Sequence, residues 1–214
     1  MIEVIKNLLR TKKIYWKYRH ILNSEVWETY YKNSYDKRRN FYSKYVYQNN
    51  LNTIFEFGCA SGPNLFNIYK NIEWDINYFG YDISNEAIKF ANNKLKKRTH
   101  FFTNKLNKES LNYKLNKWGK KKFDLSIYDR VLYLLSEKEI KEHFSEYKDY
   151  FSKLIIDDFH NSKFEDRNES YFSKNYEIIL LSIGFKLIKN EASEHLIGND
   201  NFYQRSARRL IFEK

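Results

Sequence analysis

The chain contains little cysteine, proline or glycine. Its 214 residues include one cysteine, Cys59, one proline, Pro63, and six glycines. A single cysteine excludes an internal disulfide and fits a reducing compartment. No apolar stretch approaches the roughly 18 residues that would cross a bilayer. The segment 1–10 also lacks the apolar core of a signal peptide. We therefore expect a cytoplasmic protein with no membrane insertion.

The charge is unbalanced in favour of lysine and arginine. There are 38 Lys and Arg against 27 Asp and Glu, a net charge of +11. Such an excess is typical of proteins with an anionic partner, such as nucleic acid or a membrane surface. A second explanation is A/T-rich coding, because lysine, asparagine, isoleucine, tyrosine and phenylalanine share such codons. The lysines are spread over many segments rather than one arm, which weakens the case for nucleic acid.

The apolar pattern predicts an α/β protein. Residues 1–50 show helical spacing, so we expect a helical cap there and one globular domain over 51–214. The expected strands are 53–57, 78–82, 101–103, 123–128, 154–158, 185–188 and 208–212. The expected helices begin at 63, 84, 137 and 176, whereas 104–122 is expected to be loop or weak helix. This alternation predicts a Rossmann-like, mostly parallel seven-stranded sheet with helices on both faces. The last two strands have no helix between them, so the last strand should be antiparallel.

A small-residue turn follows the first strand. Gly58-Cys59-Ala60-Ser61-Gly62 separates that strand from a helix that starts at Pro63. Small residues let a ligand lie against the backbone, and the amides of a helix start point towards it. The dinucleotide fingerprint would need glycines at positions 60 and 63, which are Ala60 and Pro63. The turn therefore argues against a dehydrogenase.

This segment resembles the first motif of class I S-adenosylmethionine-dependent methyltransferases, which runs acid-x-G-x-G-x-G. Glu56, Gly58 and Gly62 match the motif, and Ala60 replaces its middle glycine. The second marker of that family is an acid that ends the second strand, and Asp82 stands there. The resemblance implies that Asp82 accepts hydrogen bonds from both ribose hydroxyls of the cofactor, as in other nucleotide folds.

The resemblance implies further contacts with the cofactor, S-adenosylmethionine. The expected residues are Ile83 beside Asp82, Asn104 near the adenine, Tyr128 at the end of the fourth strand, and Trp27. Tyr30 and Tyr31 accompany Trp27 on the helical cap, with Arg38 or Arg39 near an anionic group. Another explanation stays open. The two glycines can form a plain tight turn, and Asp82 can be a helix cap in a domain that binds another nucleoside or none.

Candidates for catalysis follow strands four and five, where ligands sit in open α/β sheets. They are Asp129, Arg130, Asp157, Asp158 and His160. We expect His160 to be a general base, with Asp129 and Asp158 as its catalytic neighbours. The alternative is that His160 is an ordinary loop histidine. No metal is expected, although Asp157 and Asp158, with Asp129 as a third ligand, would suit a magnesium ion.

The expected reaction is methyl transfer to a small polar acceptor. A sugar hydroxyl or an amine of a surface-glycan or metabolite precursor, such as a nucleotide sugar, fits the polar, aromatic-rich insertion over 159–176. The positive charge favours the alternative of an RNA methyltransferase. A domain that binds the cofactor or a partner without catalysis is the non-enzymatic alternative. The expected assembly is a monomer or a homodimer.

Overall fold

The computed structural model describes residues 16–17, 28–29, 31, 37–160, 174–193 and 207–214. The chain divides into two compact units. The first comprises residues 1–52 and 58–106, and the second comprises 53–57 and 107–214. Each unit is described by itself. The predicted boundary between a helical cap and the rest of the chain, near residue 50, stays a prediction.

The described strands form a seven-stranded sheet in the order β3-β2-β1-β4-β5-β7-β6. Pairs β1–β4, β2–β3 and β4–β5 are parallel, whereas β7 is antiparallel to both β5 and β6. The predicted mostly parallel sheet with an antiparallel last strand is therefore confirmed. The strands are β1 (Thr53–Phe57), β2 (Asn77–Tyr81), β3 (His100–Thr103), β4 (Phe123–Asp129), β5 (Phe151–Phe159), β6 (Lys186–Ala192) and β7 (Ala207–Glu213).

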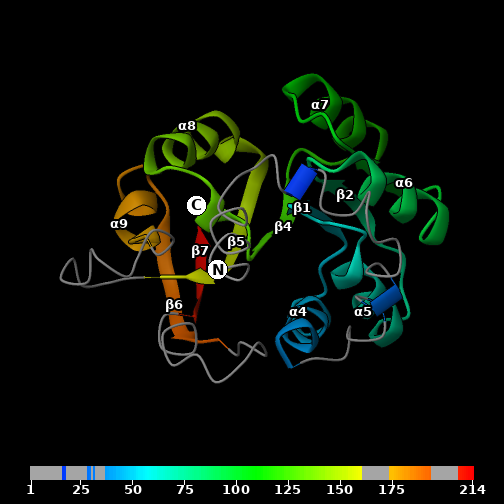
Figure 1. The fold of residues 1–214 in the computed structure, drawn as a ribbon, viewed down its shortest axis with the longest axis horizontal. Helices are drawn as coiled ribbons and strands as arrows, with labels where there is room; N and C mark the ends of the chain where they lie inside the picture. Colours follow the sequence, from blue (N-terminus) through cyan, green and yellow to red (C-terminus); the bar gives the residue numbers. More distant parts are fainter. Residues whose placement is uncertain (1–15, 18–27, 30, 32–36, 161–173, 194–206) are drawn as a thin grey trace, which may run out of the picture. The chain divides into compact units, whose positions relative to one another are not determined.

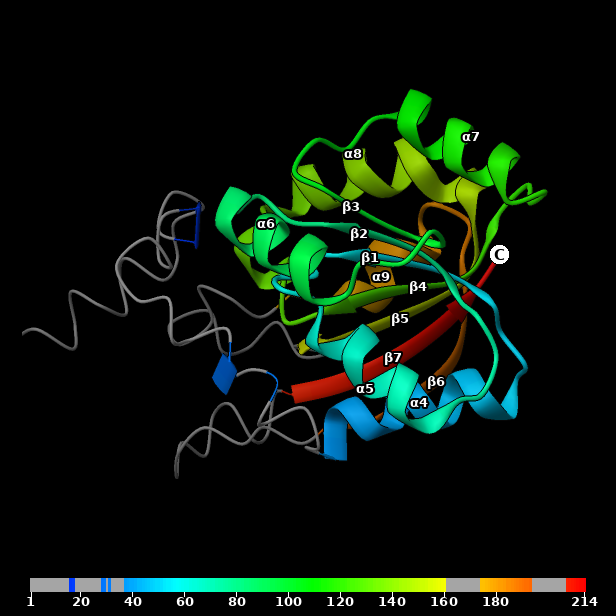
Figure 2. The ribbon, with the colours of Figure 1, turned by 90° about the vertical axis from the view of Figure 1, so that its right-hand side faces the viewer.

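The first unit carries three helices, α4 (Lys37–Gln48), α5 (Pro63–Asn71) and α6 (Asn85–Lys94). Helix α5 begins directly after Gly62 with proline at its first position, where the missing amide proton costs nothing. Helix α6 is capped by Ser84, whose hydroxyl accepts a hydrogen bond from the amide of Ala87. Helices α4 and α5 lie side by side in both views (Figures 1 and 2). Their interface is partly polar, since Asn67 on α5 is bonded to both Asn40 and Ser43 on α4.

The second unit carries helices α7 (Lys108–Lys117), α8 (Glu137–Tyr147) and α9 (Tyr176–Leu181), with short 3-10 turns η1 (Leu132–Leu134) and η2 (Lys148–Tyr150). Helix α8 opens with a reciprocal capping box between Ser136 and Glu139. Helices α8 and α9 are neighbours (Figure 1). The core is rich in aromatic side chains, all fully buried: Phe55, Phe123, Tyr128, Phe144, Phe151 and Phe212.

Helix α7 differs from the expectation of loop or weak helix over 104–122. The side chain of Asn107 caps it by accepting from the amide of Ser110 at 2.8 Å, and Leu111 and Leu115 bury its inner face. Two leucines at a spacing of four residues are enough to fix a short helix, although the surrounding lysines and asparagines obscure the pattern. Among the residues that the structure describes, no helix is both long enough and apolar enough to cross a membrane.

Candidate cofactor and acceptor sites

The turn after β1 has an unusual backbone. Gly58, Ala60 and Gly62 all have positive φ angles, of 77°, 48° and 85°. The amides of Gly58 and Cys59 both donate to the carbonyl of Tyr81, at 2.7 and 2.9 Å. Ala60 adopts a left-handed conformation that glycine adopts more readily, which explains why its position in the motif is usually glycine. The turn is therefore held in a defined shape against the end of β2.

Asp82 connects this turn to the start of α6. Its Oδ2 atom accepts from the amide of Ala60 at 2.9 Å, and its Oδ1 atom accepts from the amide of Ser84 at 2.8 Å. Burial raises the pKa of Asp82, although both backbone donors act in the opposite direction. The cap of α6 is Ser84 rather than Asp82. Each carboxylate oxygen retains a further lone pair, so Asp82 can still accept hydrogen bonds from a ligand.

Gly80 is a residue of this region that the sequence pattern did not single out. A Cβ atom added there would lie 2.8 Å from Cys59 Sγ and 2.9 Å from a ring carbon of Phe102. Strand β2 can approach the turn so closely only because position 80 has no side chain. A glycine that precedes the strand-end acid by two residues is the signal that could have identified it.

Tyr31 binds the turn from the N-terminal part of the chain. It is 4% exposed, and its hydroxyl donates to the carbonyl of Ser61 at 2.5 Å. Its ring packs edge-on against Phe66, with 4.6 Å between the ring centroids. Burial raises the pKa of Tyr31, so the hydroxyl keeps its proton. Trp27 and Tyr30, expected beside it, lie outside the described residues.

The other residues of the first unit that were expected to contact the cofactor are Asn104, Ile83, Arg38 and Arg39. Asn104 is half-buried just after β3 and donates its side-chain amide to the Asn85 side chain. Ile83 is exposed. Arg39 is buried on α4, whereas Arg38 is half-buried. The expected proximity of Arg38 or Arg39 to an anionic group stays a prediction.

Two expected cofactor residues belong to the second unit. Glu56 is buried in β1, with 2% of its surface exposed. Tyr128 is fully buried in β4, its hydroxyl is 2.8 Å from Nε2 of His143, and its ring stacks on Phe57. Burial lowers the pKa of His143 to about 3. The Tyr128 side chain is thus part of the core, so a contact with the cofactor would have to come from its backbone.

Asp157 near the end of β5 is the centre of an ion-pair network. It is fully buried, and its Oδ2 atom lies 2.9 Å from Nη2 and 3.0 Å from Nε of Arg209 on β7. Its Oδ1 atom lies 3.1 Å from Nη2 of Arg130 and accepts from the hydroxyl of Ser193 at 2.5 Å. The guanidinium of Arg130 in turn lies over the ring of Phe159. Through these contacts, the Asp157 carboxylate joins β5 to β7 and to the segment after β4.

Asp158 has a different set of partners, all of them backbone amides. Its Oδ2 atom accepts from Val131, Leu132 and Tyr133, at 3.0, 2.8 and 3.2 Å, while its Oδ1 atom accepts from Phe159. Burial raises the pKa of Asp158 to about 6, although the Arg130 charge and the backbone donors oppose it. This carboxylate therefore holds the start of η1.

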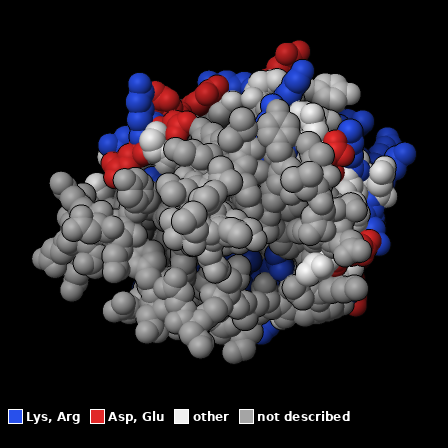
Figure 3. All heavy atoms as spheres, viewed as in Figure 1, with Lys and Arg blue, Asp and Glu red and all other residues white. Residues whose placement is uncertain are grey.

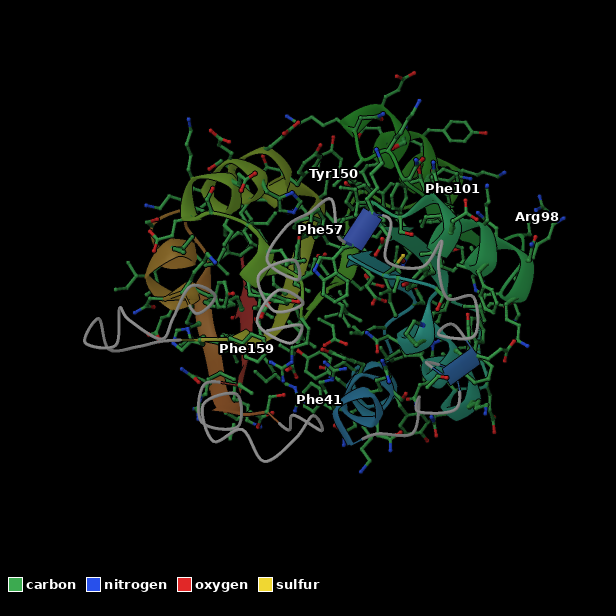
Figure 4. The ribbon with its side chains drawn as sticks, in the orientation of Figure 1. Phe41, Phe57, Arg98, Phe101, Tyr150 and Phe159 are labelled. Carbon is green, nitrogen blue, oxygen red and sulfur yellow. The ribbon has the colours of Figure 1, made fainter. Side chains whose placement is uncertain are left out.

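His160 directly follows Phe159, the last residue of β5 (Figure 4). The side chain is 5% exposed, and its ring stacks on that of Tyr176. Neither ring nitrogen has a hydrogen-bond partner of normal geometry within the described part of the chain. Burial lowers the pKa of His160 to about 4, aided by the charge of Arg208 and partly offset by the Lys174 backbone. The imidazole is therefore uncharged at neutral pH.

The acids that were expected to act with His160 have other partners in the structure. Asp157 and Asp158 are occupied by arginines and amides, and neither is hydrogen-bonded to the His160 ring. Asp129 is half-buried at the end of β4, in register with Asp157. Within the described ranges, no group of three or more His, Cys, Asp or Glu side chains is placed to hold a metal ion. Because the carboxylate oxygens of Asp157 and Asp158 already contact arginine side chains or backbone amides, these residues do not favour the magnesium alternative.

Comparison with known proteins gives a family for most of the chain. A family model described as a methyltransferase domain matches residues 48–208. No curated protein matches the sequence significantly.

Three solved structures with a similar fold are methyltransferases. Magnesium protoporphyrin IX methyltransferase from Synechocystis PCC 6803, with bound S-adenosylmethionine, is 17% identical with a TM-score of 0.62, and the match covers 95% of this chain and 97% of that one. The plantazolicin methyltransferase BpumL in complex with SAH is 18% identical with a TM-score of 0.60, over 99% and 98%. The 16S rRNA methylase ArmA is 22% identical with a TM-score of 0.52, over 82% of each chain. At these identities the likeness concerns the fold.

Proposed function

Because the chain belongs to the methyltransferase domain family, we propose that it transfers the methyl group of S-adenosylmethionine to a small polar acceptor, a sugar hydroxyl or an amine. Family membership confirms the predicted class of enzyme, and the Rossmann-like fold agrees with it. The observation that carries the choice of acceptor is His160, a buried and uncharged histidine just past the end of β5. A nucleotide sugar is the acceptor that we would test first.

The first unit supplies the residues that would hold the cofactor. The turn from Gly58 to Gly62, with its positive φ angles, leads directly into the start of α5, and Asp82 has lone pairs left for the ribose hydroxyls. Arg39 supplies a positive charge for the carboxylate of the methionine part. When bound, the cofactor contributes an electrophilic methyl group, so the protein has mainly to orient the acceptor.

His160 supplies the proton acceptor in this proposal. A hydroxyl acceptor must lose its proton as its oxygen forms the new bond to carbon, and an uncharged imidazole has a nitrogen lone pair to take that proton. Burial and Arg208 keep the ring uncharged before the reaction. An imidazolium at this position is disfavoured, so the proton must leave to water before the next cycle. Arg130, fixed by Asp157, lies in the same part of the unit and can orient an acceptor group.

The direct test is methyl transfer from labelled S-adenosylmethionine to a panel of nucleotide sugars and small amines. The wild-type protein should label at least one of them, and His160→Asn should lower kcat by at least about a hundredfold. The Kd for the cofactor should stay unchanged in that variant. Labelling of RNA, with no labelling of any sugar or amine, would contradict the proposal.

A second test concerns Asp82 and the cofactor alone. Asp82→Ala removes the acceptor of the Ala60 and Ser84 amides as well as the expected ribose contacts, so calorimetry should show at least about tenfold weaker binding of S-adenosylmethionine. Asp82→Asn keeps one oxygen and should give an intermediate Kd. Binding by Asp82→Ala equal to that of the wild type would show that the ribose is held elsewhere.

The two alternatives make separable predictions. A domain that binds the cofactor without catalysis would show a normal Kd and no turnover on any acceptor. An RNA methyltransferase would label RNA, with binding that weakens steeply as salt rises. Gel filtration with light scattering would decide between the predicted monomer and homodimer.

A further inference from the structure

The positive charge of the second unit is concentrated on one segment. Residues 108–122 contain six lysines and one acidic residue, Glu109, and so carry a net charge of +5 out of the chain's +11. The sequence alone suggested that the lysines were dispersed. The structure places these residues on α7 and on the turn that leads into β4. We call the six lysines the α7 basic surface: Lys108, Lys114, Lys117, Lys120, Lys121 and Lys122.

These lysines differ from those of α6 in their partners. Three lysines on and after α6 each have an acidic partner, with Lys89 at 2.9 Å from Glu86, Lys94 at 3.6 Å from Glu28 and Lys97 at 3.8 Å from Asp75. By contrast, five of the six lysines of the α7 basic surface, all except Lys114, make no ion pair within 4 Å with any residue that the structure describes. The charge of these five lysines is therefore not neutralised by an ion pair, although Lys122 also lies close to the carboxylate of Asp149.

The exposed face of α7 is polar and carries one aromatic ring. Leu111 and Leu115 point into the core, whereas Asn112, Tyr113 and Asn116 are exposed. Tyr113 is 61% exposed, and Lys114 Nζ lies 5.6 Å from its ring centroid. In Figure 3 the region of α7 shows Lys or Arg atoms (blue) next to Asp or Glu atoms (red). Lysine, asparagine and an exposed aromatic ring are the side chains that bind nucleic-acid backbone and bases.

The basic surface continues beyond α7 at the edge of the sheet where β4 and β5 begin. Phe123 and Phe151 are paired in register there. Lys122 and Lys148 lie close enough to Asp149 to lower the pKa of its carboxyl group, although its ion pair with Lys214 has the larger effect. Three lysines from three segments thus share one exposed carboxylate.

Helix stability explains only part of this arrangement. Lysines in the last turn of a helix interact favourably with its dipole, which accounts for Lys114 and Lys117. The same effect opposes Lys108 in the first turn, and it fades beyond the helix end, where Lys120 to Lys122 lie. A membrane surface is also disfavoured as a partner, because an interfacial helix exposes leucine, isoleucine or phenylalanine, whereas the leucines of α7 are buried.

We propose that the α7 basic surface binds the phosphate backbone of single-stranded RNA, with the ring of Tyr113 stacking on a base. This surface lies at the start of β4, whereas His160 follows the end of the adjacent strand β5. The length of β4 alone separates the two by about 20 Å. The proposal therefore goes beyond the small-acceptor reaction and holds whether or not the RNA itself is methylated.

The test is fluorescence anisotropy of labelled oligouridine with the full chain, between about 0.05 and 0.2 M KCl. The wild-type protein should bind with an affinity that falls steeply with salt. The double variant Lys117→Glu/Lys121→Glu should bind at least about tenfold more weakly and with a shallower salt slope. The matched control, Lys89→Glu/Lys94→Glu on α6, changes the net charge equally and should stay within about threefold of the wild type. Tyr113→Leu should weaken binding by at least about fivefold without changing the salt slope.

Three outcomes would overturn the proposal. One is the absence of RNA binding at about 0.15 M salt. Another is an equal loss in the α7 and α6 variants, which would indicate net charge rather than a site. The third is tighter binding to phosphatidylserine vesicles than to RNA. The α7 variant should bind S-adenosylmethionine and turn over small acceptors like the wild type, so a failure here is distinguishable from a failure of the proposed reaction.

Discussion

Acidic side chains lie at or near the ends of strands in both units, after β2 in the first and in β5 in the second, but they serve different purposes. In the first unit, Asp82 accepts one amide on each oxygen and keeps lone pairs for a ligand. In the second unit, Asp157 is bonded to Arg130, Arg209 and Ser193. Asp158 accepts four backbone amides. A carboxylate at the end of a strand is therefore a ligand-binding group only where the fold leaves it unsaturated.

The difference follows from the sheet order. Strand β7 lies beside β5 and brings Arg209 next to Asp157, opposite it in the register. Among the described residues of the first unit, Asp82 has no arginine partner, and its hydrogen bonds come from the backbone amides of Ala60 and Ser84. The comparison suggests four measurements. Three use variants, to ask which residues contribute to stability and which contribute to cofactor affinity. The fourth is the pH dependence of activity.

The largest effect is expected from Asp158→Ala. The substitution removes the shared acceptor of the amides of Val131, Leu132 and Tyr133, which lie in a buried or partly buried environment, so the free energy of unfolding should fall by about 4 kcal/mol. Urea unfolding followed by circular dichroism measures it. Asp149→Ala, on the surface of the same unit, should change stability little. A stable Asp158→Ala variant with lost activity would instead favour a catalytic role for Asp158.

The next effect is expected from Gly80→Ala. The new methyl group would meet Cys59 and Phe102 below normal contact distance, so stability should fall by about 1 to 3 kcal/mol and cofactor affinity should fall with it. Gly119→Ala is the control, because a Cβ there meets nothing within 4 Å and is disfavoured only by the positive φ. It should lower stability but leave the cofactor Kd unchanged. Unchanged cofactor affinity in Gly80→Ala would show that the shape of the turn does not contribute to cofactor binding.

A smaller effect is expected from Tyr31→Phe. The variant loses only the hydrogen bond to the Ser61 carbonyl, which is worth about 1 kcal/mol and corresponds to about a fivefold rise in the cofactor Kd. Isothermal calorimetry measures this change. Tyr47→Phe on α4, where the tyrosine is 61% exposed, should have no effect on binding. Equal values for both variants would mean that Tyr31 does not order the turn.

The smallest expected change is in the pH dependence of kcat/KM. The pKa of His160 is lowered to about 4, below the ordinary value near 6.5, so the neutral base is present above about pH 5. The activity should therefore show no acid limb near pH 6.5, and should be lost only as the pH falls through about 4. An acid limb of the pH profile near pH 6.5 that disappears in His160→Asn would show that the His160 ring is solvated during the reaction.

Much of the fold could be predicted because the signals were local. The run from Thr53 to Phe57 and the turn to Gly62 match the structure residue for residue, since a buried strand, small residues and a proline leave few alternatives. The same kind of local pattern placed Asp82 at the end of the second strand, whereas its contact with the ribose stays a prediction. The segment of α7 was predicted only as loop or weak helix, because two leucines among lysines give a weak helical period.

The roles at the ends of β4 and β5 could not be predicted from local pattern. Arg209 is 52 residues from Asp157 in sequence, and nothing near either residue indicates that β7 will lie beside β5. The hydrogen bonds that Asp158 accepts from the amides at the start of η1 likewise depend on a turn that lies 25 residues earlier in the sequence. Trp27 stays a prediction, because it lies outside the described residues.

The position of β7 has a consequence for how the chain is made. Strand β5 pairs with β4 on one side and with residues 207–213 on the other, and β6 pairs with the same late segment. During synthesis, both strands leave the ribosome before the partner that joins them. Until β7 emerges, β5 is therefore an unpaired edge and β6 lacks the strand with which it pairs, so a ribosome stalled before residue 207 should carry a chain that recruits chaperones.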